Sequence, residues 1–346
     1  MWIYKLVFEN IIAHRYNIWQ HEKGAIDMAG NRVEKDLVGA RVVPEDAYYG
    51  IHSLRAQENF PITGHKLHPQ MIESLAHVKK ACAEANRQAG AVPETVARAI
   101  EQACDEILEG RFRDQFIVDP VQGGAGTSTN MNANEVIANR AIEILGGTKG
   151  DYTLVNPNDH VNRGQSTNDV YPSCGRMTAY VLMGNLLKAL DGLIAAFHKK
   201  AEEFDGVIKM GRTQLQDAVP MRLGQEFQAY ARVMEREKGR LLRARDEMLA
   251  LNLGGTAIGT RLNAHPVFVE RVVPILAEQT GIPFVKCEDL IDGTQNADAY
   301  PALSGALKGA GMSLSKICND LRLTSSGPRT GLSEIVLPAR QNGSSI

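Results

Sequence analysis

Residues 177–204 read MTAYVLMGNLLKALDGLIAAFHKKAEEF, and this segment is the main indicator of the architecture. Its apolar residues recur at helical spacing, at Val181, Leu186, Leu190, Leu193, Phe197 and Phe204. A helix of about 28 residues is roughly 42 Å long, which exceeds the usual length in a globular domain. Because helices of that length pack side by side, the stretch predicts a helical bundle or the core of an oligomer.

Four further stretches show the same helical spacing. Two are long and run from Leu223 to Met248 and from Leu303 to Leu321. Two shorter ones lie between residues 70 and 110 and predict a pair of core helices. The sequence therefore predicts a mainly α protein built around long helices.

Composition narrows the classes of ligand. The chain has 346 residues, 44% hydrophobic and 23% charged, and a formal net charge of -2, so nothing favours nucleic acid or an anionic membrane. No run of about 18 apolar residues and no secretion signal is visible, and we expect a cytoplasmic protein with a small-molecule ligand. The cysteines have no CxxC spacing and predict reduced core thiols at Cys82, Cys104, Cys174, Cys287 and Cys318.

Three short polar segments are candidates for ligand contact. They read GGAGTSTNMN at 123–132, NRGQSTND at 162–169 and GRTQLQDAVP at 211–220. Backbone N–H groups and hydroxyls at a helix N-terminus can seat an anion, and helices are predicted from Asn134 and from near Met177. On composition alone, a Gly-rich turn, a helix cap and a polar interhelical loop explain the segments at least as well. None of them has the spacing of a P-loop or of a metal site.

The two ends of the chain differ from the rest. Residues 1–27 hold both tryptophans, and Met28 would make a natural start, so we expect an extension there, with a partly ordered arm as the alternative. The chain ends in QNGSSI, residues 341–346.

The three polar segments and the final QNGSSI together resemble the signatures of the fumarase/aspartase superfamily, whose last loop is written GSSIMPxKxN. The match runs from about Arg32 to Ile346, and the chain is identified as a member truncated at the start of that loop. Within the superfamily, Asn156-Pro157-Asn158, Gly124-Ala125-Gly126 and Ala218-Val219-Pro220 resemble the aspartate ammonia-lyase branch rather than the fumarases.

The resemblance implies an organisation for the chain. It predicts a non-family extension at 1–27, a mixed N-terminal lyase domain at 28–168 and a central helical bundle at 169–346, with the C-terminal domain absent. Family members are homotetramers whose active sites each draw on three subunits. We therefore expect an incomplete bundle to expose apolar stripes and to show poor solubility or altered association.

The resemblance also assigns site residues. Ser344 matches the family's general base. Position 214 holds Gln where many relatives have His, and this removes an ionisable group but keeps a hydrogen-bonding one. The substrate contacts carried over are Thr127, Ser166, Thr167 and Ser345 for the β-carboxylate, Asn168 with Thr127 for the amino group, Thr213 for the α-carboxylate, and Gln214 beside it.

The implied reaction is the reversible deamination of L-aspartate to fumarate and ammonia. Removal of a C3 proton places charge on the adjacent carboxylate, and hydroxyl and amide donors can stabilise the resulting aci-carboxylate. The resemblance implies no redox cofactor or metal, although magnesium activates some relatives. The alternatives are fumarate hydratase, another lyase of the superfamily, or a truncated product without catalysis.

One residue departs from the family pattern. Arg261 stands where the family's GTGLN has glycine. If that position requires a positive φ, we expect arginine there to cost about 1 kcal/mol.

Overall fold

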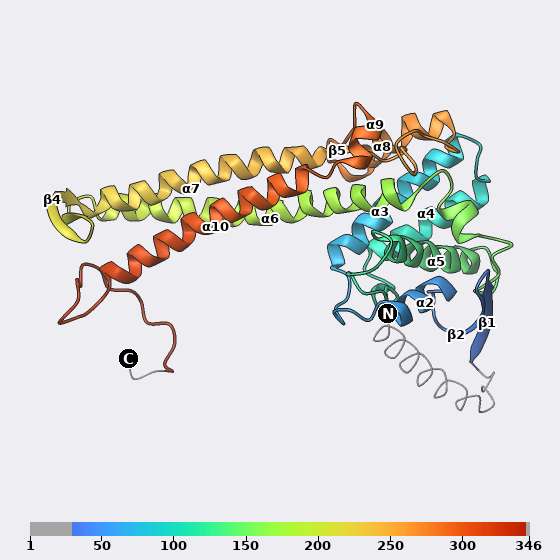
Figure 1. The fold of residues 1–346 in the computed structure, drawn as a ribbon, viewed down its shortest axis with the longest axis horizontal. Coiled ribbons are helices and arrows are strands. Elements are labelled where there is room, and N and C mark those ends of the chain that lie inside the picture. The colour runs from blue at the N-terminus through green and yellow to red at the C-terminus, as the bar shows by residue number, and fades with distance from the viewer. Residues whose placement is uncertain (1–29, 344–346) are drawn as a thin grey trace, which may run out of the picture.

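The structure is a computed structural model that describes residues 30–343. In this range the chain is mostly helical, and Figure 1 shows a compact end and a long arm. The helices are α2 (Ile51–Asn59), α3 (Pro69–Gln88), α4 (Glu94–Leu108), α5 (Thr127–Ile144), α6 (Thr167–Glu203), α7 (Leu223–Asp246), α8 (Pro266–Thr280), α9 (Leu290–Gln295) and α10 (Ala299–Thr324). Shorter helical turns are η1 (Arg113–Gln115), η2 (Pro157–Val161) and η3 (Glu247–Leu249).

Three two-stranded sheets accompany the helices. Two are antiparallel hairpins, in which Asn31 pairs with Pro44 and Thr213 pairs with Gln216. The third is a short parallel pair, formed by one strand before α8 and one strand after it in sequence. The pairs are β1 (Asn31–Asp36) with β2 (Gly39–Pro44), β3 (Ile208–Thr213) with β4 (Gln216–Arg222), and β5 (Ala250–Leu251) with β6 (Val285–Lys286).

The compact end contains the first hydrophobic core, where α3 packs against α4 and α8 and α4 packs against α5. Leu75, Val78 and Cys82 of α3 and Ile100 of α4 have no exposed surface. These residues lie three or four positions apart on their helices, so each helix turns one apolar stripe inward. The pair of helices predicted between residues 70 and 110 is confirmed by α3 and α4.

The arm consists of α6, α7 and α10, with the β3–β4 hairpin at its far tip (Figure 1). A second core runs along it, in which Leu190 of α6, Met234 of α7 and Ile317 of α10 are buried. With 37 residues, α6 is roughly 55 Å long. The three long helices predicted from the sequence are confirmed.

The starts of two helices were predicted wrongly. Helix α6 begins at Thr167 rather than near Met177, and α5 begins at Thr127 rather than at Asn134. In both helices the first turns are polar and carry no apolar periodicity. The start of α6 is set instead by a capping box. The Ser166 side chain accepts a hydrogen bond from the helix backbone, and the Asp169 side chain accepts one from the Ser166 N–H.

Helix α6 is the one helix in the range 30–343 that is long and apolar enough, by length and composition, to cross a membrane. Its buried residues pack against α7 and α10, and a bundle helix is apolar for the same reason. Only 22% of its most apolar window is buried inside the chain, so much of its surface remains open to a partner.

The cores divide the chain differently from a simple cut at residue 168. Leu251, Leu253, Phe268 and Leu276 come after the first two arm helices in sequence, yet they belong to the first core. The chain thus leaves the compact end along α6, returns along α7, rebuilds part of the first core and leaves again along α10 (Figure 1). The division at 28–168 and 169–346 stays a prediction.

Three of the five cysteines fit the prediction of core thiols. Cys82, Cys104 and Cys174 are buried, whereas Cys287 is half-buried and Cys318 lies exposed on α10. The expected extension at 1–27 and the two serines Ser344 and Ser345 lie outside the described residues.

Candidate active site

The first part of the candidate site is the start of α5. Gly126 precedes the helix with φ +94°, and a Cβ there would lie 2.4 Å from the Tyr171 ring of α6. Glycine is required at this position on both counts. The tight turn makes Thr127 the first helical residue and leaves it exposed, with its Oγ1 donating to the Gly124 carbonyl at 2.6 Å.

The second part is the start of α6. Ser166 and Thr167 are half-buried and Asn168 is exposed, so all three side chains lie within reach of a ligand. The Asn168 Nδ2 donates to the Ala257 carbonyl at 2.8 Å, and the Asn168 N–H donates to Ser166 Oγ at 3.2 Å.

Pro172 lies in the second turn of α6 and has no N–H to donate to the Asn168 carbonyl four residues earlier. The buried side chain of Asn252 replaces this bond, because its Nδ2 donates to the Asn168 carbonyl at 2.9 Å. The hydroxyl of Tyr300 donates to the Pro172 carbonyl at 2.8 Å. The loop after β5 therefore fixes the backbone that carries Asn168.

The starts of α5 and α6 meet. Asn130, one turn into α5, donates from Nδ2 to Thr167 Oγ1 at 3.3 Å and to Asn162 Oδ1 at 3.2 Å. Two helix N-termini that face one place add their partial positive charges, and their first N–H groups and hydroxyls suit a carboxylate. The structure thus places Ser166, Thr167 and Asn168 at the start of α6, next to helix α5, whose first residue is Thr127.

A buried lysine supports the loop that leads into α6. Lys79 of α3 has no exposed surface, and its Nζ donates to Asn162 Oδ1 at 2.9 Å and to Gln165 Oε1 at 2.8 Å. Burial lowers the pKa of Lys79 to about 8. Sequence reasoning missed this residue. Its signal was a lysine four residues after Leu75 and three before Cys82, on the apolar stripe of a predicted helix.

Asp169 ties two loops together inside the protein. One oxygen accepts from the Ser166 N–H at 2.9 Å, and the other accepts from the Gly254 and Thr256 N–H groups at 3.1 and 2.9 Å. Burial raises the pKa of the carboxyl group to about 6, although these N–H groups oppose the shift. The carboxylate is a structural cap, since all of its contacts are to backbone.

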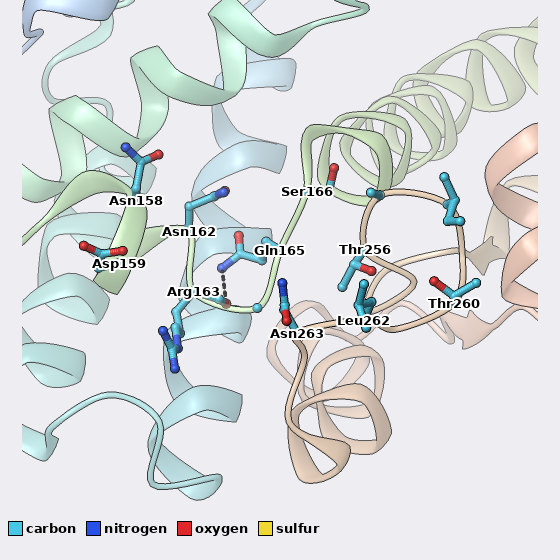
Figure 2. Close-up of a pocket in the computed structure, with 13 residues that line it drawn as sticks. Asn158, Asp159, Asn162, Arg163, Gln165, Ser166, Thr256, Thr260, Leu262 and Asn263 are labelled. Carbon is cyan, nitrogen blue, oxygen red and sulfur yellow. Dashed lines mark hydrogen bonds between the residues drawn. The ribbon is translucent and has the colours of Figure 1, made fainter. Parts of the chain in front are cut away.

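A cavity of about 520 Å³ lies beside the start of α6. Figure 2 shows one wall made by the segment from Asn158 to Ser166 and the other by the loop from Thr256 to Asn263. Arg261 lies in that second loop with φ +64°, and its N–H donates to the Gly255 carbonyl at 3.0 Å. The condition under which arginine is costly at this position is therefore met, and the cost itself stays a prediction.

The other two predicted residues, Thr213 and Gln214, lie at the tip of the arm (Figure 1). Both are exposed, and Gln214 and Leu215 form a two-residue hairpin turn with φ values of +48° and +63°. The whole length of α6 separates this tip from Ser166. The fold of one chain therefore does not bring the hairpin to the other site residues.

Comparison with known proteins gives the class of this protein. Residues 39–346 match the lyase family model, and the chain belongs to this family. It is 57% identical over 91% of its length to the aspartate ammonia-lyase of Bacillus subtilis and 52% identical, again over 91%, to that of Escherichia coli. In both cases it covers 66% of the relative, so it spans about two thirds of the length of these curated proteins.

Solved structures give the same class. A Brucella melitensis protein described as fumarate lyase:delta crystallin bound to cobalt is 50% identical, with a TM-score of 0.89 over 91% of this chain and 69% of that one. The class II fumarase of Schistosoma mansoni is 36% identical, with a TM-score of 0.88 over 91% and 70%. The mainly α fumarase/aspartase-like fold and the resemblance to aspartate ammonia-lyases are confirmed.

Proposed function

We propose that the protein is a carbon–nitrogen lyase that converts L-aspartate reversibly to fumarate and ammonia. The observation that carries the proposal is the cluster of hydroxyl and amide donors at the meeting starts of α5 and α6. The names of its relatives, at 52–57% identity, point to the same substrate.

The donor set suits this reaction because charge develops on a carboxylate. Thr127, Ser166 and Thr167, with Ser345, hold the β-carboxylate of the substrate in this proposal. When a C3 proton leaves, that carboxylate gains charge and becomes an aci-carboxylate, which fixed donors stabilise. One such donor is worth on the order of 10²–10³ in rate.

The remaining steps are assigned to residues on both sides of the substrate. Asn168 with Thr127 contacts the amino group, and Thr213 with Gln214 contacts the α-carboxylate. Ser344 takes the proton from C3, and because a serine hydroxyl is a weak base at neutral pH, the site must stabilise its alkoxide. Ammonia then leaves C2, and the electron pair of the broken C3–H bond forms the double bond of fumarate.

The separation of the two sets of residues supports assembly from several copies. A site that needs both Thr213 and Asn168 takes them from different chains when α6 keeps them roughly 55 Å apart. The exposed apolar surface of the arm offers the contact, since Met312 of α10 is 64% exposed and Leu307 is 40% exposed. We propose a homotetramer in the cytoplasm, with aspartate and fumarate as its small-molecule ligands.

Fumarate hydratase is the second candidate, favoured by the structural likeness to the Schistosoma mansoni fumarase. The two activities are separated by following fumarate formation from L-aspartate and from L-malate with the same purified protein. Fumarate from L-aspartate alone supports the proposal, and fumarate from L-malate alone overturns it. A folded protein that acts on neither substrate would indicate a product without catalysis.

A further inference from the structure

A cluster of four charged side chains lies at the base of the β3–β4 hairpin. Glu334, from the segment after α10, places Oε1 2.5 Å from Arg212 Nη1 and Oε2 2.9 Å from Lys209 Nζ. Lys209 also lies 2.5 Å from Glu226 Oε2 of α7. The cluster holds two cations and two anions, and it connects β3, α7 and the segment that follows α10.

The cluster is shielded from water at its centre. The side chains of Lys209 and Glu334 are 8% and 13% exposed, so their attraction is screened less than that of a surface pair. Burial opposes ionisation of Glu334, but the ion pair with Lys209 and the hydrogen bond from Arg212 outweigh it and lower the pKa of the carboxyl group. The removal of one partner from such a set leaves the others buried without their counter-charge.

The backbone of Glu334 is fixed separately. Its N–H donates to the Thr324 carbonyl at 2.9 Å, at the last residue of α10, and the preceding Ser333 N–H donates to the Ser326 carbonyl at 2.8 Å. The carboxylate therefore projects from an anchored point. It joins the end of α10 to β3 across a gap of more than 100 residues in sequence, since Arg212 and Glu334 are 122 residues apart.

The hairpin buries little apolar surface. No residue of β3 or β4 is fully buried, and Ile208, Leu215 and Val219 are 69%, 69% and 66% exposed. Its other tie to the arm lies at its base, where Arg222 pairs with Asp205 at 3.0 Å. The turn itself is unfavourable, because Gln214 and Leu215 both adopt positive φ without being glycine. A hairpin of this kind depends on its base for its position.

We propose that Glu334 is a positioning residue that sets the hairpin bearing Thr213 and Gln214 and, through its own backbone, the start of the segment that leads to Ser344. Arg212 is the direct neighbour of Thr213, so its pairing with Glu334 fixes the register and direction of the strand at the substrate contact. Ser344 follows Glu334 by ten residues in sequence. This inference rests on the proposed function for the roles of Thr213 and Ser344.

The test compares Glu334→Gln and Glu334→Asp with Glu203→Gln in the purified protein. Glu203 is a matched control, because it forms an exposed pair with Lys200 on the same arm. Hydrogen exchange followed by mass spectrometry reports the opening of residues 208–222. Steady-state kinetics with L-aspartate report the substrate contact.

In Glu334→Gln, the backbone amides of residues 208–222 should exchange about tenfold faster, whereas the exchange rates in the first core should not change. The same substitution should raise KM for L-aspartate on the order of tenfold, with a smaller change in kcat. Glu334→Asp keeps the charge and should recover part of both effects, and Glu203→Gln should change neither.

Unchanged exchange at 208–222 in Glu334→Gln overturns the proposal, and so does faster exchange throughout the molecule, which would mean a general loss of stability. A changed KM without a change in exchange also overturns it. If the unsubstituted protein does not deaminate L-aspartate, the proposed function is wrong, while the exchange data still decide whether Glu334 holds the hairpin.

Discussion

The compact end and the arm are stabilised in different ways. At the compact end, Leu75, Ile100, Val136 and Phe268 come from four helices and have no exposed surface. Along the arm, α6, α7 and α10 each bury one stripe and leave other apolar residues open, with Met312 64% exposed. One end is a core closed by its own chain, and the other leaves apolar side chains exposed, which in the proposed tetramer would contact another subunit.

This difference explains how the site is divided. The closed core holds Thr127, Ser166, Thr167 and Asn168 in fixed places through buried groups such as Lys79 and Asp169. The arm carries Thr213 and Gln214 to a distant tip on an exposed hairpin. In the proposed function a chain with this shape supplies two half-sites, and the two halves should respond differently to substitution.

The largest expected effect is on activity when either half-site is damaged. Asn168→Ala at the compact end and Thr213→Val at the tip should each lower kcat/KM for L-aspartate on the order of 10²–10³-fold, because each removes a donor to the substrate. When the two variants are unfolded and refolded together, activity should return, since some sites then draw both halves from intact regions of different chains.

The control for this mixing experiment pairs two variants of the same half. Thr213→Val refolded with Gln214→Ala should recover nothing, because every hairpin in the mixture is damaged. Equal recovery in both mixtures would contradict the division of the site between chains.

A change at Lys79 should affect the compact end strongly. Lys79→Met keeps the length of the side chain but removes the donor to Gln165 Oε1 and leaves Asn162 Oδ1 with only the longer bond from Asn130. We expect a loss of about 3 kcal/mol in the free energy of unfolding, measured by urea denaturation. Lys80→Met, which breaks a partly exposed pair with Asp105, should cost about 1 kcal/mol or less.

Lys79 should also make the free energy of unfolding depend on pH, with a sign that follows from its lowered pKa. Its pKa is about 8 when folded against 10.5 in the unfolded chain, so between these values the unfolded state binds more protons. Stability should therefore rise with pH in this window, by about 3 kcal/mol relative to Lys79→Met. The measurement is urea denaturation of the unsubstituted protein and of Lys79→Met over about pH 7.5 to 10.5. If Lys79 kept its ordinary pKa, the difference in the free energy of unfolding between the two proteins would not change over this range.

A smaller effect is expected on association through the arm. Met312→Glu places a charge on the open face of α10 and should weaken self-association on the order of tenfold, as measured by sedimentation. Leu37→Glu is the comparison, because Leu37 is likewise an exposed apolar residue but lies at the compact end. If both variants weakened self-association equally, the arm would not be the surface through which the chains associate.

The smallest effect concerns the strained loop beside the cavity. Arg261→Gly should stabilise the protein by about 1 kcal/mol, since glycine adopts the φ of +64° without a Cβ clash. Arg236→Gly, in the exposed face of α7, should instead cost about 1 kcal/mol because the position is helical. In urea denaturation, the free energy of unfolding should rise for Arg261→Gly and fall for Arg236→Gly.

The sequence predicted the helices better than their ends. Apolar periodicity located α3, α4, α7 and α10 closely, because a buried stripe imposes its period on the residues. It missed the first turns of α5 and α6, whose polar residues are set by capping and by contact between the helices. Those turns carry Thr127, Thr167 and Asn168 of the predicted site, so apolar periodicity gave no signal for these residues.

The family was determined by the sequence alone. Short polar signatures at 123–132, 162–169 and 211–220, in order and at suitable separations, were enough to indicate a lyase of the fumarase/aspartase type. The sequence also singled out Arg261, one of several non-glycine residues with a positive φ in the range 30–343, because a departure from glycine in a known loop is a local property. Local backbone geometry and residue type can be predicted from sequence because they depend mainly on neighbouring residues in the chain.

Which residues meet became clear only from the packing of the folded chain. It joined the starts of α5 and α6 over a buried Lys79, returned residues 250–290 to the first core, and placed Glu334 against Arg212. It also kept Thr213 and Gln214 at the far end of α6. Contacts between distant residues depend on the packing of whole helices, and the period of a helix states which face is buried but not which partner covers it.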